Sequence, residues 1–262
     1  MARAEIMAKS ISRHTLQQVL NSGGDIRNAK TTRGILTGTR YRDYSQTERK
    51  LIQDAIAAYG QYGANIYITE GIGNVDIEEI RDKVQKHIKL TGKAPVVVID
   101  YLQIIAPADI RATDKQNTDK AVLELKRLSR DYSIPVIGIS SFNRDNYTAP
   151  VNLASFKESG AIEYSSDVLI GLQYEGMDYQ EGEADGARQK RIRELVKTAE
   201  QQGRSGQAQS IQVKILKNRN GSKGDTLLDF YPMFNYFTDK REGAGHSANS
   251  GSYTKAKSNY NR

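Results

Sequence analysis

Residues 96–100 read Val96-Val97-Val98-Ile99-Asp100, four consecutive apolar residues followed directly by a carboxylate. Val and Ile favour extended backbone, and an apolar run without alternation is typical of a strand covered on both faces, as in a parallel sheet. We therefore expect a buried strand at 96–99 that presents Asp100 at its carboxyl end.

Helices are predicted on both sides of this strand. Upstream, four apolar residues recur at helical spacing and predict a helix that opens after residue 74: Ile77, Ile80, Val84 and Ile88. Downstream, a helix is expected over residues 117–132, and Pro135 then opens a second apolar strand, 136–140. The order strand, helix, strand predicts a right-handed βαβ unit. A third buried strand is expected at 168–172, and ligand chemistry at the carboxyl ends of the strands.

Further elements are expected towards the two ends of the chain. The start is predicted to be helical, and a second helix at about 47–59 is expected to lead into a short strand at 65–69. A charged helix is expected at 187–199. Two β-prone runs, 211–217 and 226–230, flank an Asn-Gly pair and predict a hairpin. Gly, Ser, Asn and Lys dominate residues 240–262, which we expect to be a disordered tail.

Composition excludes several classes of site. The chain has 262 residues, a net charge of +7 and no Cys, so disulfides, thiol catalysis and Cys-ligated zinc are excluded. Its three His residues are far apart in sequence, so a metal site built from closely spaced histidine ligands is not expected. No apolar stretch approaches the roughly 18–20 residues of a membrane helix, so we expect a cytoplasmic protein without membrane partners. The basic residues are concentrated after Gly186, which is where a polyanion is expected to bind.

An aspartate at the end of an apolar strand is what a Walker B element requires, because Mg²⁺ needs a rigidly held carboxylate beside nucleotide phosphates. On its own the pattern is weak, since many buried strands end in Asp. The phosphate loop that usually accompanies it, G-x-x-x-x-G-K-[ST], is absent. The nearest approach, residues 24–31, has Ala29 in place of the second Gly and follows a predicted helix, so we interpret it as a polar linker.

Four segments in order resemble successive motifs of the RecA-like C-terminal domain of DnaB-type replicative DNA helicases. They are Asp100-Tyr101-Leu102-Gln103, the run from Ile134 to Arg144, the segment from Lys157 to Glu163 with Asp167-Val168, and Lys217-Asn218-Arg219-Asn220-Gly221. The resemblance extends from Val96 to about Phe237. It implies an α/β fold with a mostly parallel sheet flanked by helices and a C-terminal β-hairpin. The implied activity is that of a hexameric, ATP- and Mg²⁺-dependent motor that moves on single-stranded DNA and separates the duplex.

The resemblance also implies roles for individual residues. Asp100 would hold the Mg²⁺ shell. Lys217 and Arg219 would reach the nucleotide of the neighbouring subunit, with Arg219 as the arginine finger. A central-channel loop would contact single-stranded DNA through Lys157, Glu158 and Gly160, where Lys157 replaces the usual Arg. Without the resemblance, Lys217 and Arg219 would be interpreted as hairpin-turn charges and the loop as an ordinary one.

Two departures from the family pattern bear on activity. Ser141 stands where the family usually has a Gln that senses the phosphate, and the shorter side chain puts that relay in doubt. In addition, the opening residues 1–5 resemble those that follow the family's Ser-Leu-Glu segment. The first strand, the phosphate loop and the catalytic Glu would then lie upstream of Met1. We expect a truncated and catalytically incomplete form.

The expected organisation is a partial RecA-like domain at residues 1–239. It divides into four parts: a helical lead-in at 1–64, an α/β core at 65–175, a charged helical insert at 176–210 and the hairpin at 211–239. The tail at 240–262 follows it. Implied partners are single-stranded DNA, identical or intact helicase subunits, primase and a loader. Two alternatives stay open. One is a non-enzymatic remnant that binds DNA or an intact helicase ring. The other is a relative of the RecA/RadA recombinases.

Overall fold

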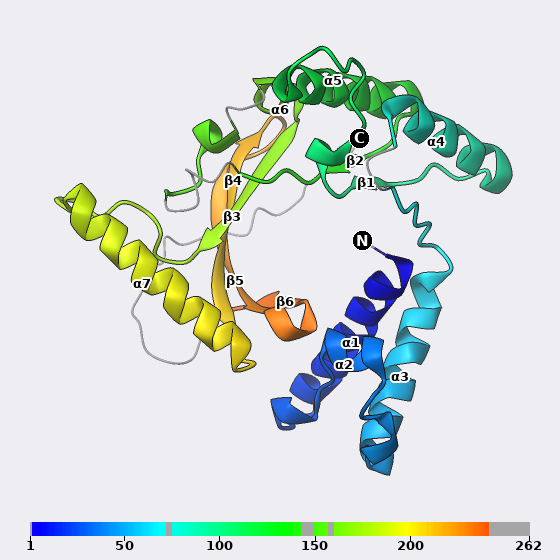
Figure 1. Cartoon of the computed structure of the whole chain (residues 1–262), viewed down its shortest axis with the longest axis vertical. Helices are drawn as coiled ribbons and strands as arrows, with labels where there is room; N and C mark the ends of the chain where they lie inside the picture. Colours follow the sequence, from blue (N-terminus) through cyan, green and yellow to red (C-terminus); the bar gives the residue numbers. More distant parts are fainter. Residues whose placement is uncertain (1, 72–74, 143–148, 157–159, 241–262) are drawn as a thin grey trace, which may run out of the picture.

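The chain begins with a helical lobe, drawn in blue and cyan in Figure 1. The computed structural model describes residues 2–71, 75–142, 149–156 and 160–240. In the lobe, short 3-10 turns at Ile26–Asn28 and Tyr41–Asp43 separate three helices: α1 (Arg3–Asn21), α2 (Thr32–Thr37) and α3 (Gln46–Gly63). The predicted helical start is confirmed, and α1 buries Ile11, Leu16 and Val19.

Helix α3 begins with a capping box that the sequence encodes. The Ser45 hydroxyl accepts a hydrogen bond from the backbone N–H of Glu48, and the Glu48 carboxylate accepts one from the backbone N–H of Ser45. Glu48 also forms an ion pair with Lys30, whose side chain is almost completely buried. This ion pair fixes the segment before α2 against the start of α3.

The predicted βαβ unit is confirmed. Helix α4 (Ile77–Thr91) leads to strand β1 (Val97–Ile99), and helix α5 (Asp114–Tyr132) connects β1 to strand β2 (Val136–Gly138). The two strands pair in parallel, with Ile99 opposite Gly138. The Asp76 carboxylate caps α4 at the Glu79 N–H, and Gly92 ends the helix at a φ of 66°. The acidic first turn of α4 thus has a structural role, as its sequence predicts.

A second, four-stranded antiparallel sheet has the order β3-β4-β5-β6. Its strands are β3 (Val168–Tyr174), β4 (Gln209–Asn218), β5 (Gly224–Tyr231) and β6 (Tyr236–Asp239). The hairpin prediction is confirmed by β4 and β5. The third predicted strand corresponds to β3, but β3 pairs antiparallel with β4 and makes no ladder with β2 among the described residues. The parallel part of the fold is therefore the β1–β2 pair.

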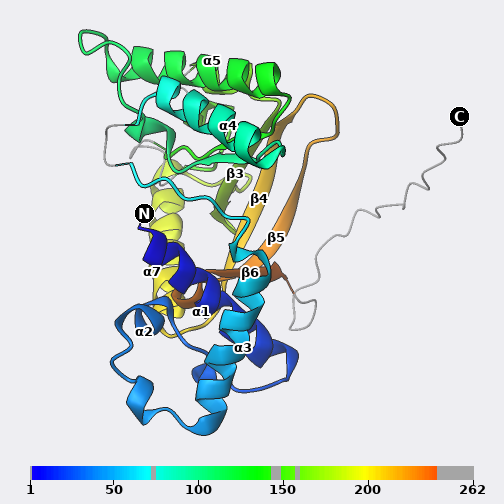
Figure 2. The ribbon, with the colours of Figure 1, turned by 90° about the vertical axis from the view of Figure 1, so that its right-hand side faces the viewer.

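Helices flank both sheets. Helix α6 (Gly160–Ser165) follows a 3-10 turn at Leu153–Phe156 and precedes β3, while α7 (Asp185–Arg204) connects β3 to β4 and contains the predicted helix at 187–199. The helical lobe packs on the far end of the antiparallel sheet, as Figure 2 shows. There Leu16, Val19 and Ala29 meet Phe234, which lies in the 3-10 turn Pro232–Phe234 before β6.

Two expectations about strands are wrong. The predicted strand at 65–69 does not form, and no strand of the described residues pairs with this stretch. The strand at 96–99 is covered on one face only: Val97 and Ile99 pack against the core, whereas Val98 is 57% exposed. The same exposed character recurs along β2 and β3, where Ile137 and Ile170 are 54% and 52% exposed.

Residues 241–262 of the predicted disordered tail lie outside the described residues. Lys157 and Glu158 lie outside them as well. Among the helices that the structure describes, none combines the length and the apolar character that crossing a bilayer demands.

Because the Lys30 side chain is buried, we expect its ion pair with Glu48 to contribute to stability. The Lys30 hydrogen bond, followed by those of Ser45, lowers the pKa of Glu48 from 4.5 to about 2. The Glu48→Gln change keeps the capping box but leaves the buried Lys30 ammonium without its counter-charge. We expect a loss of about 2 kcal/mol in the free energy of unfolding at pH 7, measured by urea denaturation.

The control for this change is Asp54→Asn, which breaks the exposed Lys50–Asp54 pair on the same helix and should cost about 0.5 kcal/mol or less. Because the folded-state pKa of Glu48 is depressed, its contribution is complete above pH 4.5 and disappears as pH falls towards 2. Equal losses for the two variants, or a difference between wild type and Glu48→Gln that persists at pH 2, would contradict this prediction.

Candidate functional site

Asp100 lies at the carboxyl edge of the parallel strands, as its position after the apolar run predicts. The ladder continues past Gly138, because the Ile139 N–H donates to the Ile99 carbonyl (2.9 Å) and the Leu102 N–H to the Ile139 carbonyl (2.8 Å). Asp100 is exposed, and no ion pair of its carboxylate is found within the described ranges. An exposed, unpaired carboxylate on a fixed strand end is suited to holding a hydrated cation.

The two strand ends are joined by a residue to which sequence reasoning assigned no role. The Gln103 side-chain amide donates to the Ser140 hydroxyl (3.0 Å) and to the Ser141 carbonyl (3.4 Å). Gln103 belongs to the segment Asp100–Gln103 that carries the resemblance, which was the only signal for it. Close packing also holds the two strand ends together, because a Cβ on Gly138 would come within 2.9 Å of Leu102. Asp100 and Ser141 therefore share one edge of the sheet.

Lys217 and Arg219 lie elsewhere, at the junction of β4 with the end of α6. The Lys217 ammonium donates to the carbonyls of Glu163 (2.6 Å) and Tyr164 (3.3 Å). Arg219 donates to the Tyr164 carbonyl (3.3 Å) and forms an ion pair with Asp167 (3.3 Å). These contacts hold both cations at the carboxyl end of α6, where backbone carbonyls lack helical partners.

Asp167 is the acceptor at the centre of this junction. Its carboxylate binds Lys126 of α5 as well as Arg219. The Lys126 hydrogen bond, with further help from the charges of Arg219 and Lys217, lowers the pKa of Asp167 against the opposing effect of burial. The carboxylate is therefore ionised at neutral pH, and this junction weakens only when the pH falls below the ordinary range of an aspartate.

One of the predicted DNA-contact residues, Gly160, adjoins the same junction. Gly160 is the first residue of α6, and the Ala161 N–H donates to Asp119 of α5 (3.2 Å). Lys157 and Glu158 stand immediately before the helix in sequence but outside the described ranges. The structure thus separates the predicted site residues into two groups, Asp100 with Ser141 and Lys217 with Arg219 beside α6. In the described part of the chain no hydrogen bond or ion pair joins the two groups.

Comparison with known proteins identifies the family. The family model described as "DnaB-like helicase C terminal domain" matches residues 6–239. The chain belongs to this family. Among DnaB-type relatives, the replicative DNA helicase DnaC of Bacillus subtilis is 28% identical over 211 residues, which is 79% of this chain and 41% of that protein. DnaB of Helicobacter pylori is 28% identical over 183 residues, 63% of this chain and 37% of that protein. The chain therefore spans about two fifths of the length of these curated DnaB-type helicases.

Solved structures agree on the fold. One of them, described as an ATPase domain, superposes with a TM-score of 0.67 at 20% identity, covering 92% of this chain and 72% of that one. A structure described as that of a DnaB-like replicative helicase and its interactions with primase gives the same TM-score and identity, and this chain covers 50% of it. The fold is that of a RecA-like helicase ATPase domain, as the resemblance implied.

The contact between Lys217 and α6 can be tested directly. Lys217→Met removes the donor to two carbonyls at the end of α6, so the amides of residues 160–166 should exchange with deuterium about three- to tenfold faster. Lys223→Met is the control, because Lys223 is an exposed lysine in the turn of the same hairpin. Equal exchange of α6 in both variants would show that Lys217 does not stabilise the helix end.

Proposed function

We propose that this chain is part of the motor of a replicative DNA helicase, in which ATP hydrolysis by a hexamer drives movement along single-stranded DNA. The observation that carries the proposal is the DnaB-like match over residues 6–239. It favours a helicase over a recombinase relative. The relatives named above are replicative helicases, and the proposal extends their activity to this chain.

In this proposal Asp100 contributes to the nucleotide site. Its exposed carboxylate stands at the carboxyl edge of β1, where α/β sheets bind ligands. Mg²⁺ bound there would neutralise charge on the phosphates of ATP. Asp100 would orient the ion or its water shell, and Gln103 would hold Ser140 and Ser141 in place beside it.

The sheet of this chain is incomplete in a way that bears on hydrolysis. Within the described ranges β2 pairs only with β1, and β3 pairs only with β4. The exposed apolar side chains on these strands include Val98, Ile137 and Ile170. Strand edges and apolar faces of this kind fit a further strand that carries the phosphate loop. We infer that hydrolysis needs polypeptide beyond these residues, because the sequence contains no phosphate-loop motif G-x-x-x-x-G-K-[ST].

The purified 262-residue protein is expected to show no DNA-stimulated ATPase activity, measured by phosphate release with and without single-stranded DNA. The physical reason is the lack of a backbone cradle for the β- and γ-phosphates. If activity is found, if Asp100→Ala abolishes it and if the exposed α4 control Asp82→Ala does not, the proposal of an incomplete site is wrong.

We further propose that Lys217 and Arg219 act on the nucleotide of a neighbouring subunit. Support comes from their separation from Asp100 and from the rigid strand that presents them. A guanidinium provides a planar pair of donors for phosphate oxygens, which suits Arg219 as the finger. DNA would be contacted by Lys157, Glu158 and Gly160, directly before and at the start of the helix that holds both cations. Cytoplasmic location and partnership with primase and a loader complete the proposal.

Action in a neighbouring subunit predicts a change in an intact ring. When the chain is mixed with an intact DnaB-family helicase, the two should co-purify and the ATPase rate of the mixture should change. The Arg219→Ala chain should still co-purify, but hydrolysis at each interface it occupies should be roughly 10³-fold slower, as expected for loss of an arginine finger, so the rate of the mixture should fall in proportion to the interfaces occupied. Lys223→Ala is the matched control. Co-purification with identical rates for both variants would indicate a chain that binds a ring without supplying a finger.

A further inference from the structure

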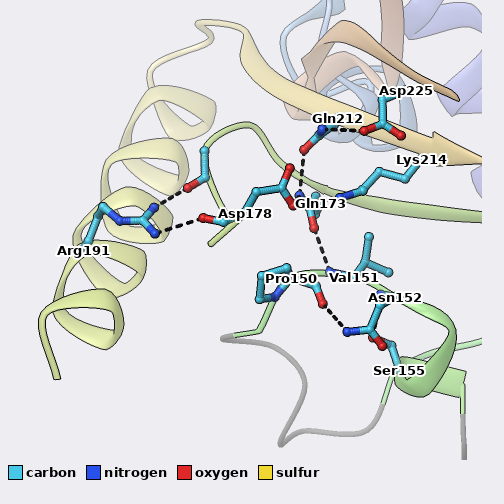
Figure 3. Close-up of polar contacts among 11 residues, drawn as sticks. Pro150, Val151, Asn152, Ser155, Gln173, Asp178, Arg191, Gln212, Lys214 and Asp225 are labelled. Carbon is cyan, nitrogen blue, oxygen red and sulfur yellow. Dashed lines mark hydrogen bonds and ion pairs between the residues drawn. The ribbon is translucent and has the colours of Figure 1, made fainter. Parts of the chain in front are cut away.

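Gln173, on β3, is buried and has all three hydrogen-bonding groups of its amide occupied, as Figure 3 shows. Its carbonyl oxygen accepts from the Val151 backbone N–H (2.7 Å). Its amide nitrogen donates to the Asp178 carboxylate (3.0 Å) and to the side-chain oxygen of Gln212 (2.7 Å). Because both hydrogens have acceptors and the oxygen has a donor, the orientation of the amide is fixed.

The Val151 contact anchors a segment of irregular backbone to β3. Val151 is buried, and a Cβ on Gly171 of β3 would come within 2.6 Å of its side chain, so the Val151 side chain packs directly on the backbone of β3. The segment continues through a turn in which the Asn152 N–H donates to the Ser155 hydroxyl (3.1 Å). It ends at Phe156, whose ring packs edge-on against Phe142, directly after Ser141 (5.1 Å between centroids).

On its other side, the Gln173 amide is connected to β4. Gln212 of β4 in turn donates to Asp225 of β5 (3.1 Å), and Lys214 of β4 donates to Asp178 (2.7 Å). Burial raises the pKa of Asp178, but the hydrogen bonds from Lys214 and Gln173 outweigh it and the pKa is lowered overall. Asp178 therefore accepts as a carboxylate at neutral pH.

Strand β4 is thus linked to both of the segments that flank residues 157–159 in the sequence. Near its start, Gln212 reaches Val151 through Gln173, and the segment from Val151 ends at Phe156. Near its end, Lys217 binds the carbonyls of α6, which begins at Gly160. The Gln173 amide links the sheet to the first of these neighbours, and this link needs both a donor and an acceptor.

We propose that Gln173 is a positioning residue that sets the place of residues 150–156 relative to β4, and thereby the affinity of the chain for single-stranded DNA. The inference rests on the proposed function, in which DNA is contacted by residues 157–160, which follow this segment in sequence. Leucine at this position would leave the Val151 N–H buried without an acceptor. Glutamate would keep that acceptor while losing both donors.

The test compares Gln173→Leu with Gln209→Leu in the full chain. Gln209 is a similarly buried glutamine on β4, and its amide donates to the Ala199 carbonyl (2.6 Å) far from residues 150–156. Gln173→Leu deletes three hydrogen bonds of the side-chain amide and Gln209→Leu deletes the one to Ala199, so the unfolding midpoint should fall further for Gln173→Leu. Only Gln173→Leu should accelerate amide exchange in residues 150–156, by roughly five- to tenfold.

Affinity for a labelled oligo-dT, measured by fluorescence anisotropy, supplies the second readout. Gln173→Leu should bind about tenfold more weakly than Gln209→Leu. Gln173→Glu should also accelerate exchange in residues 150–156, because it loses both donors to Asp178 and Gln212 and places a second carboxylate beside Asp178. If exchange in 150–156 is the same in both leucine variants, or if Gln173→Glu exchanges and binds DNA as the wild type does, Gln173 does not position this segment. The glutamate variant also decides the matter if Gln173→Leu does not fold.

A failure of the proposed DNA contact would give different results from a failure of the Gln173 proposal. If the wild-type chain does not bind oligo-dT, or if Lys157→Ala leaves binding unchanged, the DNA contact is wrong, while the exchange comparison still decides whether Gln173 fixes residues 150–156. Equal DNA affinity of the two leucine variants, together with a clear effect of Lys157→Ala, would overturn the positioning role in DNA binding.

Discussion

The apolar face of α5 is the constraint on which the rest of the α/β region depends. Leu125 and Leu128 are buried in one cluster with Val97 and Ile99 of β1, Val136 of β2 and Leu169 of β3. Full burial of one leucine stabilises a fold by about 1.5–3 kcal/mol, so these two leucines contribute substantially to the packing that joins the two sheets. The edge that bears Asp100 and the junction at Asp167 are both placed by packing on α5, because Lys126 of the same helix binds Asp167.

Local features of this fold were predictable from the sequence. Helix α4 follows from its apolar spacing, α5 was expected at nearly its observed bounds, and the hairpin follows from an Asn-Gly pair between β-prone runs. Pairing partners were harder to predict. Strand β3 has the composition of a buried parallel strand, yet it pairs antiparallel with β4, because β4 is the neighbouring strand the chain provides. The stretch at 65–69 has β-favouring residues but no partner strand within the described residues, so it stays irregular.

The site shows the same division between local and long-range information. The position of Asp100 follows from the strand that precedes it. The contacts of Lys217 and Arg219 with the end of α6 could not be read from spacing, since they join residues more than fifty positions apart. The Gln173 amide was equally invisible, because a single glutamine in a strand carries no motif. Contacts of this kind depend on which backbone groups the tertiary fold leaves without partners.

The uncovered apolar strands also determine how this chain behaves in solution. An open strand edge flanked by exposed Val and Ile side chains is a template for pairing with any other extended chain, including a second copy of itself. In β3 this edge lies beside Val168, Ile170 and Leu172, whose side chains are about half exposed. Because this surface is built into the α/β region itself, colloidal stability will depend on protein concentration, and self-association will compete with any partner that covers these strands.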